Sequence, residues 1–365
     1  MNYNVPPDFQ INHQKRSIKK LITGEDLNQA LESLNQSIKN QLLDEANFWS
    51  ANLLISGYRD QLWKYLILFY FKHINCINPL LLDYLYQQYL LYTQIKKLYV
   101  RNLKNLPNNQ ELRNHLSELV SLLALTSKLS EEIIIPTEVQ NVKIDRDIIR
   151  KSHHLTCLLL KNISPQSVLY QQFYGFVVNY HSNHLINCFY YLNWFINDND
   201  YMYETEIECK IPSYLTGHSI LLVLKFLLLQ IKTQIKNNPQ ISHLVDINTN
   251  ISNVLSFYFM AYKQKLLEHC FYIMTYLILL SKNLTLQTFN NHLDLQNPSI
   301  IQQILTINYL YQELNTISVQ HGEKTNPKSK SKSKERTNNP LNDPKIQEYL
   351  RIINDIDLLV PYSTK

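Results

Sequence analysis

Residues 33–79 read SLNQSIKNQLLDEANFWSANLLISGYRDQLWKYLILFYFKHINCINP, and this stretch decides the fold. It holds two of the chain's three tryptophans, Trp49 and Trp63, and one of its five glycines, Gly57. Apolar residues recur on both sides of Gly57 at the spacing of a buried helical stripe: Ala46, Trp49 and Leu53 before it, and Leu62, Leu66 and Phe69 after it. A glycine just past a helix end lets the chain turn back in a left-handed conformation. The stretch therefore predicts a helical hairpin with an aromatic core.

The composition favours helices throughout the chain. With 365 residues, the chain is long enough for two domains with substantial cores. Five glycines are few for a strand-rich fold, which uses glycine in turns and bulges. The predicted fold class is all-α.

Breaks in the helical periodicity predict the domain organisation. The run EEIIIPTEVQNVK is β-branched and interrupted by Pro136, which indicates an extended connector between two helical domains. A later polar run with alternating Lys and Ser indicates disorder. In chain order we expect a flexible arm at 1–20, a helical domain at 21–130, the connector at 131–143, a second helical domain at 144–320, a disordered basic linker at 321–343, and a C-terminal helix and tail at 344–365.

Two helices near the ends of the chain are predicted from caps and periodicity. Thr23 with Asp26 matches a cap-plus-acid pattern for a first helix over Thr23–Ile38. The segment Lys345–Leu359 (KIQEYLRIINDIDLL) places Ile346, Leu350, Ile353 and Ile356 on one face. A helix tethered by a linker needs an apolar surface, either on this chain or in the groove of a partner.

The formal net charge of +5 is concentrated in one tract. KTNPKSKSKSKER, residues 324–336, carries six of the 35 basic residues and one of the 30 acidic residues, which leaves 29 of each in the rest of the chain. The tract is interpreted as a solubilising linker, as a contact for nucleic-acid phosphates, or as a targeting or phosphorylation segment. The candidate nucleic-acid contacts are Lys324, Lys328, Lys330, Lys332, Lys334 and Arg336.

Cysteine usage and hydropathy indicate a soluble intracellular protein, without distinguishing nucleus from cytoplasm. The five cysteines are odd in number and mostly lie within apolar helical stretches, which is typical of reduced, buried thiols. No apolar run reaches the roughly 20 residues that a membrane-spanning helix needs, so we expect no membrane partner.

A search for catalytic motifs predicts a protein that is not an enzyme and holds no cofactor. The sequence contains neither GxxxxGK[ST] nor a glycine-rich dinucleotide fingerprint. It also has no G-x-S-x-G elbow, because Gly217-His218-Ser219 lacks the second glycine. Acidic residues are scattered singly, and no pair stands out as general acid and base.

The strongest metal candidate is His181, His184 and Cys188. On a single helix these residues would share one face, and imidazole and thiolate are good zinc ligands, with Cys209 or His218 as a fourth. The surrounding residues are large and apolar, which favours a core helix that buries Cys188. We therefore predict no metal site.

The stretch around Gly57 also resembles a known family. It contains Ser33-Leu34, Ser37-Ile38-Lys39, an EANFWSA helix at residues 45–51, the break at Gly57 and a turn at 74–79. Further along, LSELVSLLALTSK is similar to a later family helix. This order resembles the C-terminal helical region of the replication-associated recombination AAA+ ATPases, the RarA (or MgsA) and Werner helicase-interacting protein type, and more distantly the collar domains of clamp loaders. The motif residues are Ser33, Ser37, Glu45, Trp49, Gly57, Trp63 and Pro79.

The resemblance covers residues 25–129 and lacks the family's ATPase module, so ATP hydrolysis is not carried over. The family's acidic-Ile-Gly turn reads His73-Ile74-Asn75 here, and no role of that turn is carried over. The resemblance implies a non-catalytic helical factor for protein–protein interaction or assembly in DNA replication or repair, with replication proteins as partners; a homo-oligomer is left open. A helical module of this kind without its ATPase, in a sequence rich in Asn, Ile and Lys, looks like a protein of a large DNA virus. The alternative is therefore a scaffolding protein of such a virus without nucleic-acid contact.

Overall fold

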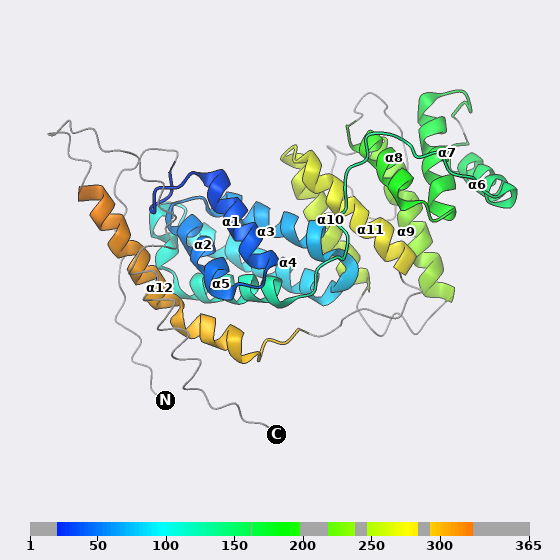
Figure 1. The fold of residues 1–365 in the computed structure, drawn as a ribbon. Coiled ribbons are helices and arrows are strands. Elements are labelled where there is room, and N and C mark those ends of the chain that lie inside the picture. The colour runs from blue at the N-terminus through cyan, green and yellow to red at the C-terminus, as the bar shows by residue number, and fades with distance from the viewer. Residues whose placement is uncertain (1–19, 162, 198–217, 238–246, 284–292, 324–365) are drawn as a thin grey trace, which may run out of the picture. The chain divides into compact units, whose positions relative to one another are not determined.

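The computed structural model describes residues 20–161, 163–197, 218–237, 247–283 and 293–323 (Figure 1). These residues form helices and no β-strand, which confirms the predicted all-α class. They divide into two compact units. Unit 1 consists of the described parts of Met1–Phe69, Tyr84–Ser127 and Leu293–Lys365, and unit 2 of those of Tyr70–Asp83 and Lys128–His292. Each unit is therefore built from separate stretches of sequence, whereas the expected domains were the consecutive segments 21–130 and 144–320.

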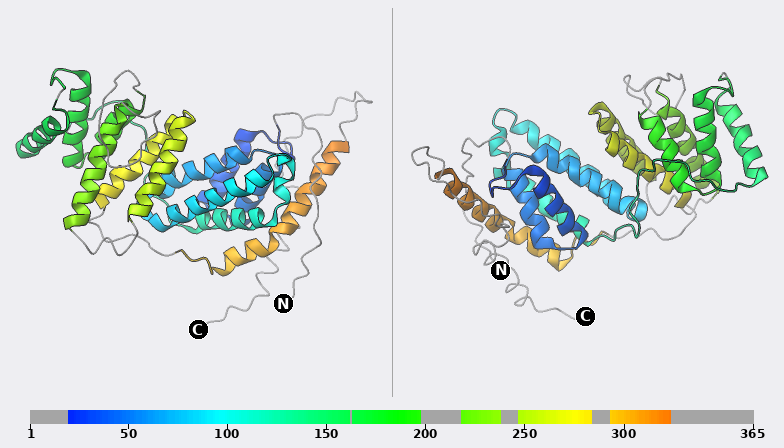
Figure 2. Two further views of the ribbon diagram at one scale, coloured as in Figure 1. Left: turned by 180° about the vertical axis from the view of Figure 1, so that it is seen from behind. Right: turned by 45° about the horizontal axis from the view of Figure 1, so that its top comes forward.

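Unit 1 is built around one helix that is covered on all sides. Its helices are α1 (Leu27–Lys39), α2 (Leu43–Ile55), α3 (Arg59–Phe69), most of α4 (Pro79–Leu98), a 3₁₀ turn (Leu103–Asn108), α5 (Gln110–Leu125) and α12 (Pro298–Glu323). The helices α1, α3, α5 and α12 all pack against α2 (Figures 1 and 2). Every residue of α2 from Ala46 to Ile55 is buried. Full burial explains why α2 is apolar around its whole circumference rather than along one stripe.

The first helix begins later than the sequence pattern predicts. Asp26 is the N-cap of α1, and its carboxylate accepts a hydrogen bond of 2.9 Å from the backbone N–H of Gln29. Thr23 lies in the preceding turn, where its hydroxyl donates to the Glu25 carboxylate. The prediction that the helix starts at Thr23 is therefore wrong, because Asp26 satisfies the free N–H group of the first turn.

Among the described residues, four helix ends share one backbone motif. After α2, the N–H of Gly57 donates to the Leu54 carbonyl (3.2 Å) and the N–H of Tyr58 donates to the Leu53 carbonyl (2.9 Å). This double hydrogen bond is the Schellman motif, which places a left-handed residue just past the helix. Gly57 has φ +89°, as the hairpin prediction requires. The equivalent positions after α1, α7 and α10 hold Gln41, Asn183 and Lys265, each with positive φ.

Replacing the glycine at one of these ends should lower stability, and introducing a glycine at another should raise it. A side chain in the left-handed region costs roughly 1–2 kcal/mol relative to glycine. No atom lies within 4 Å of a Cβ built at Gly57, so Gly57→Ala should lose about that amount through backbone strain alone. Lys265→Gly should gain about 1 kcal/mol. Urea denaturation measures both, and a Lys265→Gly variant that is less stable than the parent would contradict this account.

Unit 2 is a second helical body with an aromatic centre. It contains a π-helical turn (Tyr70–Ile74), a 3₁₀ turn (Asn75–Ile77), α6 (Arg146–Leu159), α7 (Val168–His181), α8 (Leu185–Asn197), α9 (Ile220–Asn237), α10 (Ile247–Lys263) and α11 (Leu267–Asn283). The helices α7 and α8 pack together, α6 packs on α7, and α11 contacts α8, α9 and α10. The Phe226 ring of α9 meets the rings of Phe176 and Tyr180 edge-on, with centroids 5.8 and 5.0 Å apart.

Several predicted segments fall outside the described residues. These are nearly all of the arm at 1–20, most of the basic linker at 321–343 and the C-terminal segment at 344–365. The helix α12 runs to Glu323, which lies three residues into the predicted linker. In the part of the chain that the structure describes, no helix is long and apolar enough to cross a membrane.

Candidate functional site

The structure brings the polar residues of the family-like motif together. The Ser37 hydroxyl of α1 lies 2.8 Å from the carbonyl oxygen of Ser33 and 3.3 Å from a carboxylate oxygen of Glu45 on α2. The hydroxyl therefore links α1 to the first turn of α2. This contact stabilises the packing of two helices and leaves no group directed at a ligand.

The aromatic motif residues belong to the core of unit 1. Trp49 is 3% exposed and Trp63 is 2% exposed. The Trp63 ring stacks on that of Tyr92 in α4, with centroids 5.0 Å apart and planes 24° apart. Pro79 is the first residue of α4, where proline's missing N–H costs nothing. The two tryptophans are thus packed in the core of unit 1, as the hairpin prediction expects, while Pro79 begins a helix in unit 2.

A buried polar cluster lies where the hairpin continues into unit 2. The hydroxyl of Tyr70 donates toward two backbone carbonyls, those of Asn75 (2.8 Å) and Asn78 (3.0 Å). Asn75 has φ +53°, and its side-chain amide donates to the Phe71 carbonyl (2.6 Å). Side chains thus bind the backbone groups that the change from π to 3₁₀ helix releases from regular pairing.

The same cluster extends onto α10 and α11. The Asn250 amide donates to the Pro79 carbonyl (3.0 Å) and to the Asp83 carboxylate (3.2 Å), and its oxygen accepts from the Tyr276 hydroxyl (2.5 Å). Asn253 donates to the same carboxylate at 2.8 Å. Burial raises the pKa of Tyr276 well above its usual range, so its hydroxyl stays protonated as a donor. The cluster is a satisfied structural network and presents no open reactive group.

The metal candidate, His181 with His184 and Cys188, required all three residues to lie on a single helix, and the structure has two helices there. The helix α7 ends at His181, Asn183 follows in a left-handed conformation with φ +60°, and α8 begins at Leu185. His181 and His184 therefore lie on either side of a helix break and do not share one helical face with Cys188. The interpretation of these residues as one continuous helix is wrong, because the chain turns at Asn183.

The individual side chains have structural contacts instead. Nδ1 of His181 lies 3.0 Å from the hydroxyl of the buried Ser152, and burial lowers the pKa of His181. Burial raises the pKa of Cys188 to about 12. The His218 ring lies 3.0 Å from a tyrosine hydroxyl, and Cys209 falls outside the described residues. Among the residues with described positions, no three His, Cys, Asp or Glu side chains are grouped to hold a metal ion.

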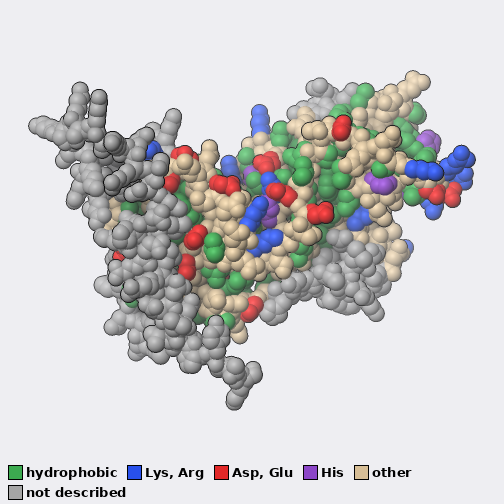
Figure 3. Space-filling view, in the orientation of Figure 1, with side chains coloured by type: hydrophobic (Ala, Val, Ile, Leu, Met, Phe, Trp, Pro, Cys, Tyr) green, Lys and Arg blue, Asp and Glu red, His purple; other side chains and the backbone are tan. Residues whose placement is uncertain are grey.

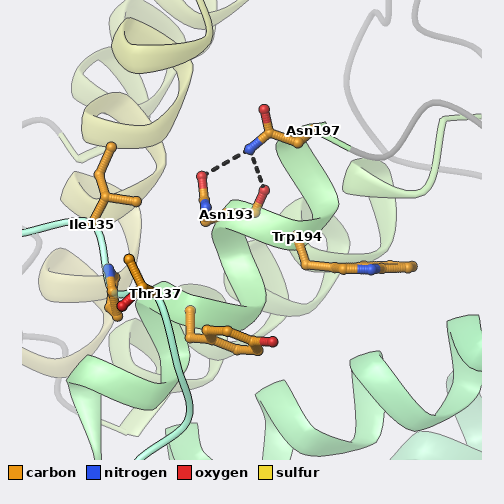
Figure 4. A pocket seen from close by; sticks show the side chains of 7 residues that line it. Ile135, Thr137, Asn193, Trp194 and Asn197 are labelled. Atoms are coloured by element: carbon orange, nitrogen blue, oxygen red, sulfur yellow. Dashed lines mark hydrogen bonds between the residues drawn. The ribbon is translucent and has the colours of Figure 1, made fainter.

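An open pocket of about 500 Å³ lies on unit 2 beside α8 (Figure 4). Four of its lining side chains come from α8 at helical spacing, and they are Tyr190, Asn193, Trp194 and Asn197. Phe189, Leu192 and Phe195 point into the core. The helix therefore carries an apolar stripe toward the core and a second stripe, which mixes aromatic rings and amides, toward the pocket.

The other lining residues are Ile135, Pro136 and Thr137, which belong to the extended segment that follows α5 and precedes α6 in the sequence. Hydrogen bonds hold this segment in place both before and after residues 135–137. The Tyr272 hydroxyl donates to the Ile133 carbonyl (3.2 Å). The Asn187 amide donates to the Gln140 carbonyl (3.0 Å) and accepts from the Gln140 N–H (2.8 Å). The predicted connector is thus one wall of a pocket and is fixed to the helices of unit 2.

The pocket lining is uncharged and partly aromatic. The rings of Tyr190 and Trp194 and the ring of Pro136 supply flat apolar surfaces. The Asn197 amide donates to the carbonyl and the side-chain oxygen of Asn193, at 2.8 and 2.9 Å, and so orients the Asn193 amide (Figure 4). This arrangement can hold a neutral ligand with apolar faces and hydrogen-bonding groups, and it offers no general acid or base.

The sequence predicts Pro136 as a break in an extended connector, and its pattern does not place Pro136 or the third tryptophan, Trp194, in a site. The residues that it missed are Ile135, Thr137, Tyr190, Asn193 and Asn197. One pattern in the sequence could have found the α8 half of the pocket: Tyr190, Asn193, Trp194 and Asn197 recur at i, i+3, i+4 and i+7 on the side opposite the apolar stripe.

A second candidate site is the exposed basic surface of α6 and its flanking residues. Five basic side chains between residues 143 and 161 are exposed, against two exposed acids in the same stretch. Figure 3 shows Lys and Arg side chains with a few carboxylates gathered at the right-hand edge of the view, where α6 lies. The basic residues are Lys143, Arg146, Arg150, Lys151 and Lys161, and the acids are Asp145 and Asp147. The predicted basic contacts from Lys324 to Arg336 lie outside the described residues.

No protein family, curated protein or solved structure matches this chain. The resemblance of residues 25–129 to the RarA-type helical region therefore stays a prediction.

Proposed function

We propose that this protein is a non-catalytic interaction factor that binds a proline-rich segment of a partner protein in the pocket beside α8. One observation carries the proposal. Tyr190 and Trp194 stand one helical turn apart on α8 and line the same pocket as an extended wall that hydrogen bonds hold in place. A rigid aromatic surface of this kind is typical of sites that bind protein segments.

The uncharged lining favours a proline-rich segment over other ligands. Polyproline II segments dock into aromatic grooves, because proline rings pack between aromatic side chains and the conformation is already formed before binding. Carbonyl groups of such a segment have no internal hydrogen bonds and can accept from Asn193, Tyr190 and Thr137. A nucleic-acid base would stack on the same rings, but a phosphate chain would need basic neighbours, and none lines the pocket.

The proposed setting is DNA replication or repair, and it rests on the resemblance of residues 25–129 to the RarA-type helical region. The alternative, a scaffolding protein of a large DNA virus, would use the same pocket for assembly contacts. Both settings agree on a protein partner, so binding of a peptide can be tested before the setting is known.

The experiment is a titration of the full chain against a labelled peptide with Pro-x-x-Pro repeats, followed by fluorescence anisotropy. The control peptide carries glycine in place of each proline and is therefore not preorganised. Saturable binding of the proline peptide alone supports the proposal. Equal binding of both peptides, or binding of neither, would refute it.

The exposed basic surface of α6 supports a second candidate function, contact with nucleic-acid phosphates. Neutralised phosphates release counterions, so affinity falls with salt in proportion to the number of contacts. The structure offers five exposed basic side chains for such contacts within one short stretch. This surface would serve the replication setting and has no role in the scaffolding alternative.

Reversing two charges on α6 is expected to weaken DNA binding and to flatten its salt dependence. The variant Arg150→Glu/Lys151→Glu should reduce the slope of log affinity against log salt by about 2 for duplex DNA. The matched control Lys97→Glu/Lys104→Glu makes the same change of net charge at exposed positions of unit 1. If the control lowers affinity equally, net charge alone is responsible and α6 is no specific contact surface.

A further inference from the structure

The outward face of α12 is unusually apolar for a helix that borders water. Ile301, Leu305 and Tyr309 recur every four residues and are 44%, 47% and 49% exposed. Between Pro298 and Ile317 the sole charged residue is Glu313. The opposite face packs on α2 and α5 through residues such as Ile307, Leu310 and Leu314. A surface helix normally turns charged and polar residues outward, so this face has the composition of a covered one.

The geometry points to an occupant from the same chain: residues 345–359, docked along the exposed face of α12 defined by Ile301, Leu305 and Tyr309. This inference is independent of the peptide pocket on unit 2. The segment has an apolar face of its own, formed by Ile346, Leu350, Ile353 and Ile356. An isolated helix of about 15 residues is marginal in water and gains its stability by packing such a face against another surface.

The length of the intervening chain fits this arrangement. From Leu305 to the end of α12 at Glu323 the helix rises about 27 Å, at 1.5 Å per residue. Residues 324–344 form a tether of 21 residues, rich in Lys and Ser. A random-coil chain of this length has a root-mean-square span of roughly 25 Å. The segment can therefore return antiparallel along α12 and reach Leu305 without stretching the tether.

The tether also favours this occupant over a second copy of the chain. A short flexible tether holds its segment at an effective concentration on the order of 1 mM near the attachment point. A second molecule would have to exceed that concentration to compete for the same apolar face. Docking within the chain would thus cover the face of α12 and leave the basic tract 324–336 as a loop beside it.

The test is photo-crosslinking in the full chain. A photoreactive phenylalanine analogue replaces Tyr309, the protein is irradiated at high dilution, and crosslinked peptides are identified by mass spectrometry. We expect crosslinks to residues 345–359 within single molecules. The same analogue at the exposed Gln94 of α4 is the positional control and should give no crosslink to that segment.

Two tail variants make the result specific. Leu350→Asp/Ile353→Asp places charges on the apolar face and should lower the crosslink yield about tenfold or more. Gln347→Asp/Asn354→Asp adds the same charges on the other face and should leave the yield unchanged. Crosslinks that join two molecules, or a yield that Leu350→Asp/Ile353→Asp does not change, would overturn the inference.

Discussion

Replacing Asn250 with leucine is expected to lower the free energy of unfolding by about 3 kcal/mol. The Asn250 side chain is buried and bonds the Pro79 carbonyl, the Asp83 carboxylate and the Tyr276 hydroxyl. Leucine has the same branched arrangement of four side-chain heavy atoms and no polar atom. The substitution therefore leaves the Pro79 carbonyl and the Tyr276 hydroxyl buried without this partner. Each abandoned group costs roughly 1–3 kcal/mol. Asp83 keeps its hydrogen bond from Asn253, which limits the loss.

Urea denaturation followed by circular dichroism measures this loss. Asn248→Leu is the matched control, because it makes the same change at an exposed position of the same helix and should cost less than about 0.5 kcal/mol. The double variant Asn250→Leu/Tyr276→Phe removes the abandoned hydroxyl and should cost less than the sum of the two single variants. Strict additivity would show that the hydrogen bond between these side chains contributes nothing to stability.

Trp194→Ala is expected to weaken binding of the proline-rich peptide by about 30-fold, which corresponds to roughly 2 kcal/mol. Trp194 contributes the largest ring of the pocket lining. Its removal takes away one of the two aromatic rings in the lining, against which a proline ring would pack. The side chain is partly exposed, so the stability of the folded chain should change far less than the affinity.

Two further variants test whether the loss of affinity comes from the missing Trp194 ring or from a disturbed fold. Trp194→Phe keeps an aromatic face and should retain most of the affinity. Leu158→Ala removes an apolar side chain that is 50% exposed on α6 and should leave peptide affinity unchanged. If Trp194→Ala binds the peptide as the parent does, the aromatic stripe of α8 is not the binding surface.

The sequence predicted the features that depend on local chemistry. Gly57 and the apolar stripes on both sides of it predict a helical hairpin. A left-handed turn and a helical period of 3.6 residues can both be recognised from residues a few positions apart. The same local logic failed at Asn183, where a non-glycine residue adopts the left-handed conformation and ends α7. Gln41 and Lys265 repeat that substitution, so a search for glycine alone misses three of the four Schellman ends that the described helices show.

The pocket depends on contacts between distant positions that no local pattern records. Its walls come from residues 135–137 and from α8, about fifty positions later in the sequence. Asn187 joins them by binding the backbone of Gln140, a pairing that any asparagine on any helix could make. The division into units cannot be seen in a local pattern for the same reason. In unit 1, α12 packs on α5 and α2, which begin roughly 190 and 255 residues earlier in the sequence.

Fluorine NMR of the chain labelled with fluorotryptophan tests the proposed function most directly. The three tryptophans give three resonances, which the variants Trp194→Phe and Trp63→Phe assign. Trp49 and Trp63 are buried in unit 1 and report only on folding, whereas Trp194 lines the pocket. As the proline-rich peptide is added, we predict that the Trp194 resonance alone shifts and saturates. A Trp194 resonance that stays in place while the peptide binds would contradict the assignment of this pocket as the binding site.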